Sequence, residues 1–533
     1  MQVLVIGLDG VCLPVLDAVG EHGRLPRLED LRSTSAVAPL ESQLPPWTPS
    51  AWPSMYTGVN PGKHGVYDFH RFDGYDWDVV NRSHVREFAI WELLSRHGFS
   101  SVVVNVPVTH PPEPFDGALV PGYTAPEGAT CNPSGLFSDL ERALDRYSIY
   151  GETLDRGTTG ADMQRELVDL TRMRGEAFRY LVERYDPDFG FVQFQTTDTV
   201  HHEFPGDHEA AFPVYRAVDH EVDKVLEMID AELTMVVSDH GMGPMDGFEF
   251  RMNDFLLEGG WVRTTTDGSG MPSWKTVTRE GTDGGRTGWP MRATRMGIGL
   301  AARVGLTSRR ISSLFEQFGL DDWAVDTVPD ELIRTGLEQV DFPQSTAYMR
   351  ARTEMGIRLN VEGREPAGCI SPDNYEDTRD ELIAALRQVT TPAGGPVFER
   401  VQPREAVFEG PYLEYAPDIV TVPDQFDHFL VANLKGTMFG DPTEPFEHKP
   451  YGILMARGDS VEPTVSLGDP QLLDIAPTIL SSFGLPISDR MDGEPLPFVE
   501  RTPPEAYPTF EATLVDTCSD AVEQRLADLG YLH

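Results

Sequence analysis

Seven residues spread along the chain carry side chains that could together bind two divalent metal ions and cleave a phosphoester. They are Asp9, Thr48, Asp198, His202, Asp239, His240 and His448. Carboxylates and imidazoles are ligands that zinc accepts, and three of each are sufficient for two ions. The remaining group is the hydroxyl of Thr48, which could attack phosphorus once a metal ion or a base activates it.

Three of these residues follow apolar runs that are typical of buried strands. Asp9, Asp198 and Asp239 come after the runs Val3–Leu8, Phe189–Phe194 and Leu233–Val237, in that order. Ligands of open α/β sheets bind beyond the carboxyl ends of the strands, so three distant segments can converge on one site there. Taken alone, each aspartate could instead cap a helix or lie in a loop.

In two of the candidate segments, the spacing of the residues supports the prediction of metal ligands. Asp198 and His202 are four residues apart, which would place them on the same face of a helix. Asp239 and His240 are neighbours, and Gly241 behind them permits tight backbone packing. Histidine and aspartate together are good zinc ligands.

Thr48 stands in a stretch rich in proline and tryptophan, from residue 45 to residue 58. If a helix begins at Thr48, its backbone amides and the helix dipole would favour a bound phosphate. The simpler interpretation is that Thr48 only caps the helix, which is a common role of threonine. The local sequence leaves both interpretations open.

Short apolar runs alternate with helical patterns along the chain, which predicts an α/β fold with a mostly parallel sheet covered by helices. Further strands are expected at Ser101–Val106, Asp418–Val422 and Gly452–Ala456. We expect residues 1–254 and 341–500 to form the two parts of a catalytic core, residues 255–340 an inserted cap or subdomain, and residues 501–533 a C-terminal extension.

The predicted insertion contains a basic stretch in an otherwise acidic chain. Between residues 284 and 315 there is no acid, and the basic residues are Arg286, Arg292, Arg295, Arg303, Arg309 and Arg310. A solvated helix face is one interpretation. A second is a lid that steers an anionic substrate, with Arg303, Arg309 and Arg310 as candidate substrate contacts. A third is docking on anionic lipid.

The charge balance of the chain is unusual. There are 85 acidic against 43 basic residues, so the formal net charge is −42. An acidic surface of this kind is typical of a halophilic, archaeal protein that stays dissolved in molar salt, where the Debye length is only about 3 Å. An ordinary acidic enzyme is the alternative. Nucleic acid is not expected as a partner, because phosphate contacts need clustered positive charge.

Other features of the sequence bear on the location of the protein. Its four cysteines are far apart, which argues against a disulfide framework or a cysteine-based metal site. No stretch reaches the roughly 20 apolar residues that a membrane span needs, and no signal segment precedes the first apolar run. We therefore expect a cytoplasmic protein without a transmembrane segment. The sequence does not indicate an oligomeric state.

Several longer strings occur in an order that matches one known family. They are Val5-Ile6-Gly7-Leu8-Asp9-Gly10, Thr48 with Thr57-Gly58, Asn60-Pro61-Gly62-Lys63-His64-Gly65, Thr197-Asp198 with His202, Ser238-Asp239-His240-Gly241-Met242-Gly243, Glu447-His448-Lys449-Pro450, and Asp474-Ile475-Ala476-Pro477-Thr478 with Met491-Asp492-Gly493. With these strings the chain resembles the alkaline phosphatase superfamily, and within it the type I phosphodiesterase/nucleotide pyrophosphatase branch. The resemblance implies an alkaline phosphatase-like three-layer sandwich with a mostly parallel central sheet and an inserted cap segment.

The resemblance also implies a role for each of the seven residues. The ligand sets would be Asp198, His202 and His448 for one ion, and Asp9, Asp239 and His240 for the other. Thr48 would be a further ligand of the second ion and the nucleophile. The expected cofactors are two Zn²⁺ ions, with Mn²⁺ as the alternative, because three histidines favour zinc. The expected reaction is hydrolysis of phosphodiester or pyrophosphate bonds in an anionic substrate.

The chain departs from the family pattern at one position. Nucleotide pyrophosphatases of this branch usually have an asparagine that contacts the phosphate, in a region that here reads Tyr67-Asp68-Phe69-His70. The contact to the phosphate oxygen must therefore come from another group, such as the Thr48 backbone amide or His70. Nucleotide specificity does not follow from the resemblance.

Three other functions belong to similar sites. A phosphomonoesterase or phosphotransferase would use the same seven residues. A sulfatase would need a cysteine or serine in a C/S-x-P-x-R string, whereas this chain has Thr48-Pro49-Ser50-Ala51-Trp52. A non-catalytic binding protein would be expected to lack at least one of the seven residues, and all are present.

Overall fold

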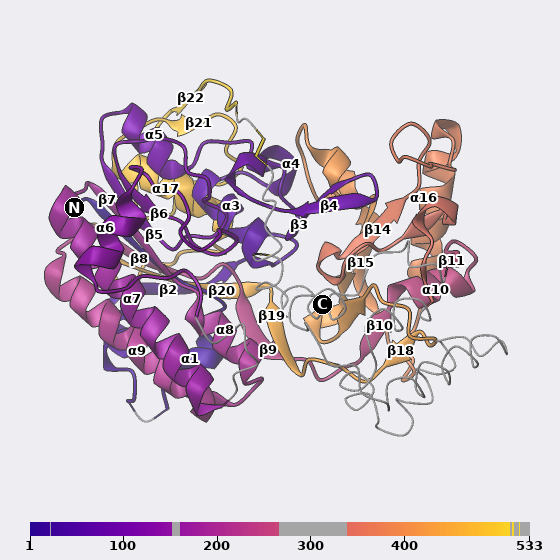
Figure 1. The fold of residues 1–533 in the computed structure, drawn as a ribbon, viewed down its shortest axis with the longest axis horizontal. Coiled ribbons are helices and arrows are strands. Elements are labelled where there is room, and N and C mark those ends of the chain that lie inside the picture. Colours follow the sequence, from indigo (N-terminus) through magenta and orange to yellow (C-terminus); the bar gives the residue numbers. More distant parts are fainter. Residues whose placement is uncertain (22, 152–159, 266–337, 512–513, 516–521, 523–533) are drawn as a thin grey trace, which may run out of the picture.

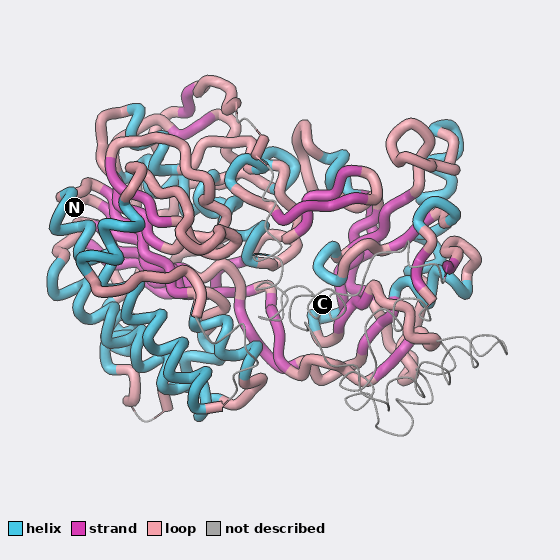
Figure 2. Tube along the Cα trace, in the orientation of Figure 1, coloured by secondary structure: helices cyan, strands magenta, loops and turns pink. Residues whose placement is uncertain are grey.

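The computed structural model describes residues 1–21, 23–151, 160–265, 338–511, 514–515 and 522. These residues form two lobes of unequal size (Figure 1). The larger lobe contains the N-terminal half and the C-terminal part of the chain. The smaller lobe is built from the elements between β10 (Glu249–Arg251) and β18 (Phe439–Gly440). Figure 2 shows that the long helices lie in the larger lobe.

A seven-stranded sheet forms the centre of the larger lobe. In spatial order its strands are β2 (Ala36–Glu41), β20 (Tyr451–Gly458), β8 (Leu233–Val237), β1 (Val3–Leu8), β7 (Phe189–Phe194), β5 (Ser101–Val104) and β6 (Gly117–Val120). Only β20 runs against the other strands of this sheet. The sheet is therefore mostly parallel, as the alternation of apolar runs and helical patterns predicts.

Helices cover both faces of this sheet. Successive residues of a strand point to opposite faces, so each strand can contribute side chains to a hydrophobic cluster on either face. In β1, Val3 and Val5 pack into one hydrophobic cluster, whereas Leu4 and Ile6 pack into another. The first cluster includes residues of α3 (Thr48–Thr57), α5 (Ile90–Arg96) and α17 (Ile475–Ser482). The second includes residues of α1 (Leu13–Val19), α2 (Pro26–Thr34), α6 (Leu136–Ala143), α7 (Ala161–Tyr185) and α9 (His208–Met228). This arrangement confirms the predicted three-layer sandwich.

The smaller lobe has its own sheets and its own hydrophobic cluster. Its four-stranded sheet consists of β13 (Ala347–Tyr348), β14 (Gly356–Leu359), β16 (Ile419–Pro423) and β15 (Phe398–Pro403), in that order. Helix α16 (Tyr375–Leu386) packs against β15. The remaining elements are β10, β17 (Phe429–Val431) and β18 in one sheet, β11 (Thr264–Thr265) paired with β12 (Gln339–Val340), and α10 (Met252–Glu258).

Five of the six predicted strands belong to the central sheet, but the run at Asp418–Val422 does not. It forms β16, which pairs antiparallel with β14 and β15 in the smaller lobe. Strand periodicity is a local property, so it cannot tell which sheet a strand joins. Most of the predicted insertion, residues 266–337, lies outside the described residues, so its extent stays a prediction.

Short elements complete the larger lobe and link it to the smaller one. The two-stranded ribbon of β9 (Gly241–Pro244) and β19 (Phe446–Lys449) runs from the central sheet toward the smaller lobe (Figure 1). The hairpin of β3 (His70–Asp73) and β4 (Asp76–Val79) also reaches it. Other elements are α4 (Pro61–His64), α8 (Thr196–Glu203), and β21 (Ile487–Ser488) paired with β22 (Pro504–Glu505). Among the described helices, none combines the length and the apolar character that a membrane span requires.

Candidate active site

Three buried aspartates meet at the carboxyl ends of neighbouring strands. Strand β1 lies between β7 and β8 in parallel register, with Leu8 opposite Phe194 and Gly7 opposite Val237. Asp9 follows β1, Asp239 follows β8, and Asp198 lies in the first turn of α8 beyond β7. The parallel register therefore brings the three carboxyl groups to one edge of the sheet, where all of them are fully buried.

The Asp9 carboxylate is held from one side by two hydrogen bonds. Its Oδ2 atom accepts from Trp52 Nε1 at 3.0 Å and from Gln193 Nε2 at 2.6 Å. Trp52 reaches this position because it packs on Gly7, where a Cβ atom would lie 2.7 Å from the indole ring. With Oδ2 occupied in this way, Oδ1 is the atom that faces Thr48.

Thr48 is the first residue of α3, and Trp47 rather than Thr48 is the N-cap. The interpretation of Thr48 as a simple capping residue is therefore wrong. Its hydroxyl oxygen lies 3.4 Å from Asp9 Oδ1 and 3.4 Å from His240 Nε2. The side chain is buried, with a relative exposure of 1% for the residue. A hydroxyl in this position faces one carboxylate and one imidazole at equal distances.

The ribbon of β9 and β19 brings two histidines from distant parts of the chain together. Met242 pairs with His448 and Gly241 with Lys449, so His240 lies beside His448. His240 Nδ1 donates to the Gly241 carbonyl at 3.1 Å, and His448 Nδ1 donates to the Pro46 carbonyl at 3.0 Å. Because a carbonyl can only accept, both rings carry their proton on Nδ1, which leaves the Nε2 lone pairs available as ligands.

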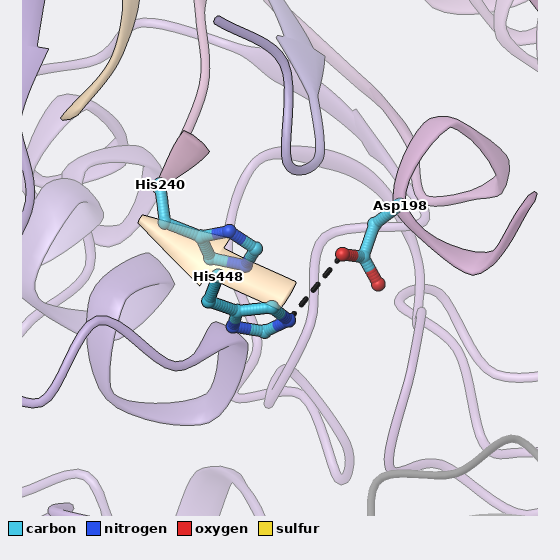
Figure 3. Close-up of side chains that lie close together, drawn as sticks. All are labelled: Asp198, His240 and His448. Carbon is cyan, nitrogen blue, oxygen red and sulfur yellow. Dashed lines mark ion pairs between the residues drawn. The ribbon is translucent and has the colours of Figure 1, made fainter. Parts of the chain in front are cut away.

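A second group of side chains surrounds His448. His448 Nε2 lies 3.4 Å from Asp198 Oδ1. Figure 3 marks this ion pair with a dashed line. His202 Nε2 lies 3.4 Å from Asp198 Oδ2 and 3.1 Å from His448 Nε2. All seven residues of the predicted site thus lie in one continuous cluster.

The spacing of these atoms fits divalent metal ions. Ligand atoms about 2.0–2.1 Å from a tetrahedral zinc ion are about 3.3 Å apart. Asp9 Oδ1 and Asp239 Oδ2 lie 3.5 Å and 3.3 Å from His240 Nε2, and the pairs around Asp198 have similar distances. In the described residues, three groups of potential ligands have their ligand atoms within 4.8 Å of one another, namely Asp9 with Asp239 and His240, Asp198 with His240 and His448, and His202 with Glu447 and His448.

The electrostatics of the cluster also favour binding of a cation. Burial and the neighbouring Asp239 raise the pKa of Asp9 well above its ordinary value, and burial and Asp198 raise the pKa of Asp239 to about 7. Burial would lower the pKa of His202, but Asp198 and Glu447 raise it to about 10. Carboxyl groups that resist ionising beside one another are typical of a site whose bound metal supplies the balancing charge.

Glu447 belongs to this cluster although it is not among the seven residues predicted from the sequence. It is buried, and its Oε1 lies 3.3 Å from His448 Nε2 and 3.8 Å from His202 Nε2. The signal that could have found it is its place directly before His448. It was missed because adjacent residues of a strand normally point to opposite faces.

The predicted substrate contacts are His70 and three arginines of the predicted insertion. His70 is buried at the start of β3, and its ring lies near the rings of Phe72 and Trp77. It lines a small cavity with Arg71, Arg350 and Tyr415 that contains none of the seven site residues. Arg303, Arg309 and Arg310 lie outside the described residues. A role in substrate binding stays a prediction for all four residues.

Comparison with known proteins gives one family match. The family model for type I phosphodiesterase/nucleotide pyrophosphatase matches residues 3–290. This range contains six of the seven site residues and ends before His448. No curated protein matches the chain in sequence.

Several solved structures share the fold. Phosphonoacetate hydrolase from Sinorhizobium meliloti 1021, in complex with phosphonoformate, matches with a TM-score of 0.51 and 16% identity over 89% of this chain and 94% of that one. An inactive murine ectonucleotide pyrophosphatase/phosphodiesterase 5 in complex with AMP has a TM-score of 0.50 and 12% identity, over 91% and 95% of the two chains. Wild-type alkaline phosphatase PafA has a TM-score of 0.50 and 12% identity, over 93% and 98%.

Proposed function

The chain belongs to the type I phosphodiesterase/nucleotide pyrophosphatase family of phosphoric ester hydrolases, and on this premise we propose that it hydrolyses phosphodiester or pyrophosphate bonds with Thr48 as the nucleophile. One observation carries the proposal. The Thr48 hydroxyl is buried at the N-terminus of α3, 3.4 Å from both Asp9 Oδ1 and His240 Nε2. A threonine hydroxyl needs a metal or a base to become a nucleophile, and this position offers ligands for a metal.

Two divalent ions, preferably zinc, are the proposed cofactors. Asp9, Asp239, His240 and Thr48 would hold one ion, and Asp198, His202 and His448 would hold the other. The distances of 3.1–3.5 Å between their ligand atoms support this division. When bound, the ions would lower the pKa of the Thr48 hydroxyl and balance negative charge on the phosphoryl group.

The proposed reaction has two displacements at phosphorus. The Thr48 oxygen forms a bond to phosphorus while the bond from phosphorus to the leaving oxygen breaks, which yields a phosphothreonine. Water then attacks the same phosphorus, breaks its bond to the Thr48 oxygen and restores the hydroxyl. In the first displacement the Thr48 hydroxyl gives its proton to solvent and the leaving oxygen takes one up from solvent. In the second, the attacking water supplies the proton that restores the hydroxyl.

The first turn of α3 would contribute to binding the phosphoryl group. The Thr48 N–H has no acceptor within the helix, because the first N–H groups of a helix lack intrahelical partners. Pro49 has no N–H, and the amides of Ser50 and Ala51 donate to the Trp47 carbonyl at 3.0 Å and 2.9 Å. The Thr48 N–H and the helix dipole would therefore face the negative charge of the phosphoryl oxygens.

The enzyme is proposed to work at molar salt concentration. The net charge of −42 over 533 residues supports a halophilic enzyme of the archaeal type, whose self-repulsion is screened in molar KCl. The basic stretch with Arg303, Arg309 and Arg310 is proposed to steer the anionic substrate.

The test compares two model substrates in molar KCl with added zinc or manganese. The wild type should hydrolyse bis-p-nitrophenyl phosphate faster than p-nitrophenyl phosphate. Thr48→Val, which keeps the shape of the side chain without the hydroxyl, should abolish turnover. Thr57→Val is the matched control, because its hydroxyl lies at the other end of α3, where it donates to the Pro53 carbonyl.

The outcomes separate the candidate activities. Faster hydrolysis of the monoester would identify a phosphomonoesterase that uses the same residues. If Thr48→Val retained wild-type turnover, Thr48 could not be the nucleophile. No turnover of either substrate by the metal-loaded wild type would contradict the proposed reaction.

A further inference from the structure

We propose that Glu447 is a fourth protein ligand of the metal ion that Asp198, His202 and His448 would hold, an inference that rests on the proposed function. The spacing of its carboxylate, the path of its side chain and the balance of buried charge around it support this assignment.

Glu447 Oε1 has the spacing of a ligand atom. It lies 3.3 Å from His448 Nε2 and 3.8 Å from His202 Nε2. The Asp198 oxygens lie 3.4 Å from the same two nitrogens. The residue has a relative exposure of only 2%, so water does not solvate this carboxylate freely. Two carboxylates therefore approach the same two imidazoles at similar distances.

The path of the side chain explains how two adjacent residues of β19 reach one site. Neighbouring residues of a strand normally point to opposite faces. Here the His448 backbone N–H donates to Glu447 Oε1 at 3.1 Å. This hydrogen bond turns the Glu447 side chain back along its own strand toward the His448 ring. Glutamate is long enough for this turn, whereas aspartate would fall short.

Arg352 holds the other oxygen of Glu447. Its Nη2 atom donates to Glu447 Oε2 at 3.0 Å, and its guanidinium lies over the Phe429 ring, 4.5 Å from the centroid. Arg352 comes from the smaller lobe, near the start of β14. Because Oε2 is occupied by Arg352, Oε1 is the atom that remains for the histidines.

An ion pair with Arg352 does not account for Glu447 by itself. Arg352 also binds both oxygens of Glu444, at 2.5 Å and 3.2 Å. One guanidinium thus faces two carboxylates, which leaves a negative charge in a buried region. Burying a charge is costly unless it is paired, and a divalent ion at the two histidines would pair with the Glu447 carboxylate.

The experiment measures zinc binding directly. Metal-free wild type, Glu447→Gln and Glu444→Gln are titrated with zinc in competition with a chromogenic chelator. The wild type should bind two ions tightly. Glu447→Gln should bind one of them at least about tenfold to 100-fold more weakly, since even partners outside the first coordination sphere cause losses of this size.

Glu444→Gln is the matched control. It removes the same charge from the same Arg352 cluster, but Glu444 pairs with Arg352 rather than with the histidines, so both zinc affinities should stay close to those of the wild type. If the two variants lose affinity equally, Glu447 acts through its charge alone and the proposal fails. It also fails if Glu447→Gln binds both ions like the wild type, or if the wild type binds no zinc.

A spectroscopic measurement keeps the test independent of activity. Replacing zinc by Co²⁺ should give visible absorption bands that change in Glu447→Gln and not in Glu444→Gln. Should Glu447→Gln fail to fold, Glu447→Asp retains the charge but shortens the side chain, and the same loss of one ion is expected. A wild type that binds two zinc ions but hydrolyses no phosphoester would remove the proposed function and leave this ligand assignment standing.

Discussion

The imidazole of His240 stacks on that of His448, with ring centroids 3.7 Å apart and ring planes inclined by 19° (Figure 3). The antiparallel pairing of β9 and β19 produces this contact. Burial and the neighbouring His448 lower the pKa of His240 well below its ordinary value. The low pKa keeps the His240 ring neutral, and because its Nδ1 donates to the Gly241 carbonyl, its Nε2 lone pair is free to bind metal.

Removing the metal should lower both stability and activity. The ligands exist as one cluster only in the folded chain, so metal binding stabilises the folded state. Zinc at about 100 times its dissociation constant should add about 2.7 kcal/mol per site. Thermal unfolding after exhaustive chelation should therefore show a lower Tm that zinc restores. A metal-free protein with the original Tm and full turnover would contradict the proposed cofactors.

Gln193 should matter for catalysis although it does not face the hydroxyl of Thr48. Its amide donates to Asp9 Oδ2 at 2.6 Å, and Asn105 in turn donates to Gln193 Oε1 at 2.7 Å. Gln193→Met keeps the length of the side chain but removes the hydrogen bond that orients Asp9.

The expected loss for Gln193→Met is about 10-fold to 100-fold in kcat or in zinc affinity, as for other partners of metal ligands, with KM nearly unchanged. Gln164→Met is the control, because Gln164 donates only to the Ala210 carbonyl on the far helical layer. Equal kinetic constants for Gln193→Met and the wild type would show that Trp52 alone suffices to orient Asp9.

Because of His64, the free energy of unfolding should decrease as the pH is lowered from neutral. The residue is buried, with Nδ1 accepting from the Val66 N–H at 3.2 Å and Nε2 lying 2.8 Å from Ser54 Oγ of α3. Burial lowers its pKa to about 3. In the unfolded chain the pKa is about 6.5, so the unfolded state binds the proton first, and stability is lost as the pH falls from about 6.5 toward about 3.

His64→Gln should therefore be less stable at pH 7 but show a flatter dependence of the unfolding free energy on pH over that range. Denaturant unfolding at a series of pH values measures this slope. A wild-type slope in His64→Gln would mean that other groups dominate acid unfolding.

Salt should stabilise the folded protein. The net charge is −42, and raising KCl from about 0.1 M to about 1 M shortens the Debye length from about 10 Å to about 3 Å. Repulsion between surface carboxylates should weaken, so Tm measured by calorimetry should rise with KCl. Sucrose at matched osmolality is the control for water activity. A Tm that does not depend on KCl would favour an ordinary acidic enzyme.

Much of the fold could be predicted from local patterns. The buried runs before Asp9, Asp198 and Asp239 were recognisable because fully buried parallel strands are apolar along their whole length. The sheet that β16 joins could not be predicted, because nothing in residues 418–422 distinguishes a strand of the smaller lobe from one of the central sheet. The start of α3 at Thr48 was suggested by its sequence, but the choice of Trp47 as N-cap depends on the packing of the preceding segment.

The sequence by itself determined which chemical groups are present and that three aspartates stand at strand ends, since periodicity and residue type are local properties. Only the tertiary structure decided that His240 stacks on His448 and that Arg352 of the smaller lobe holds Glu447 Oε2. These contacts depend on the register of β9 with β19 and on packing between the two lobes. Both join segments far apart in the chain, and their free energies arise only when those segments meet.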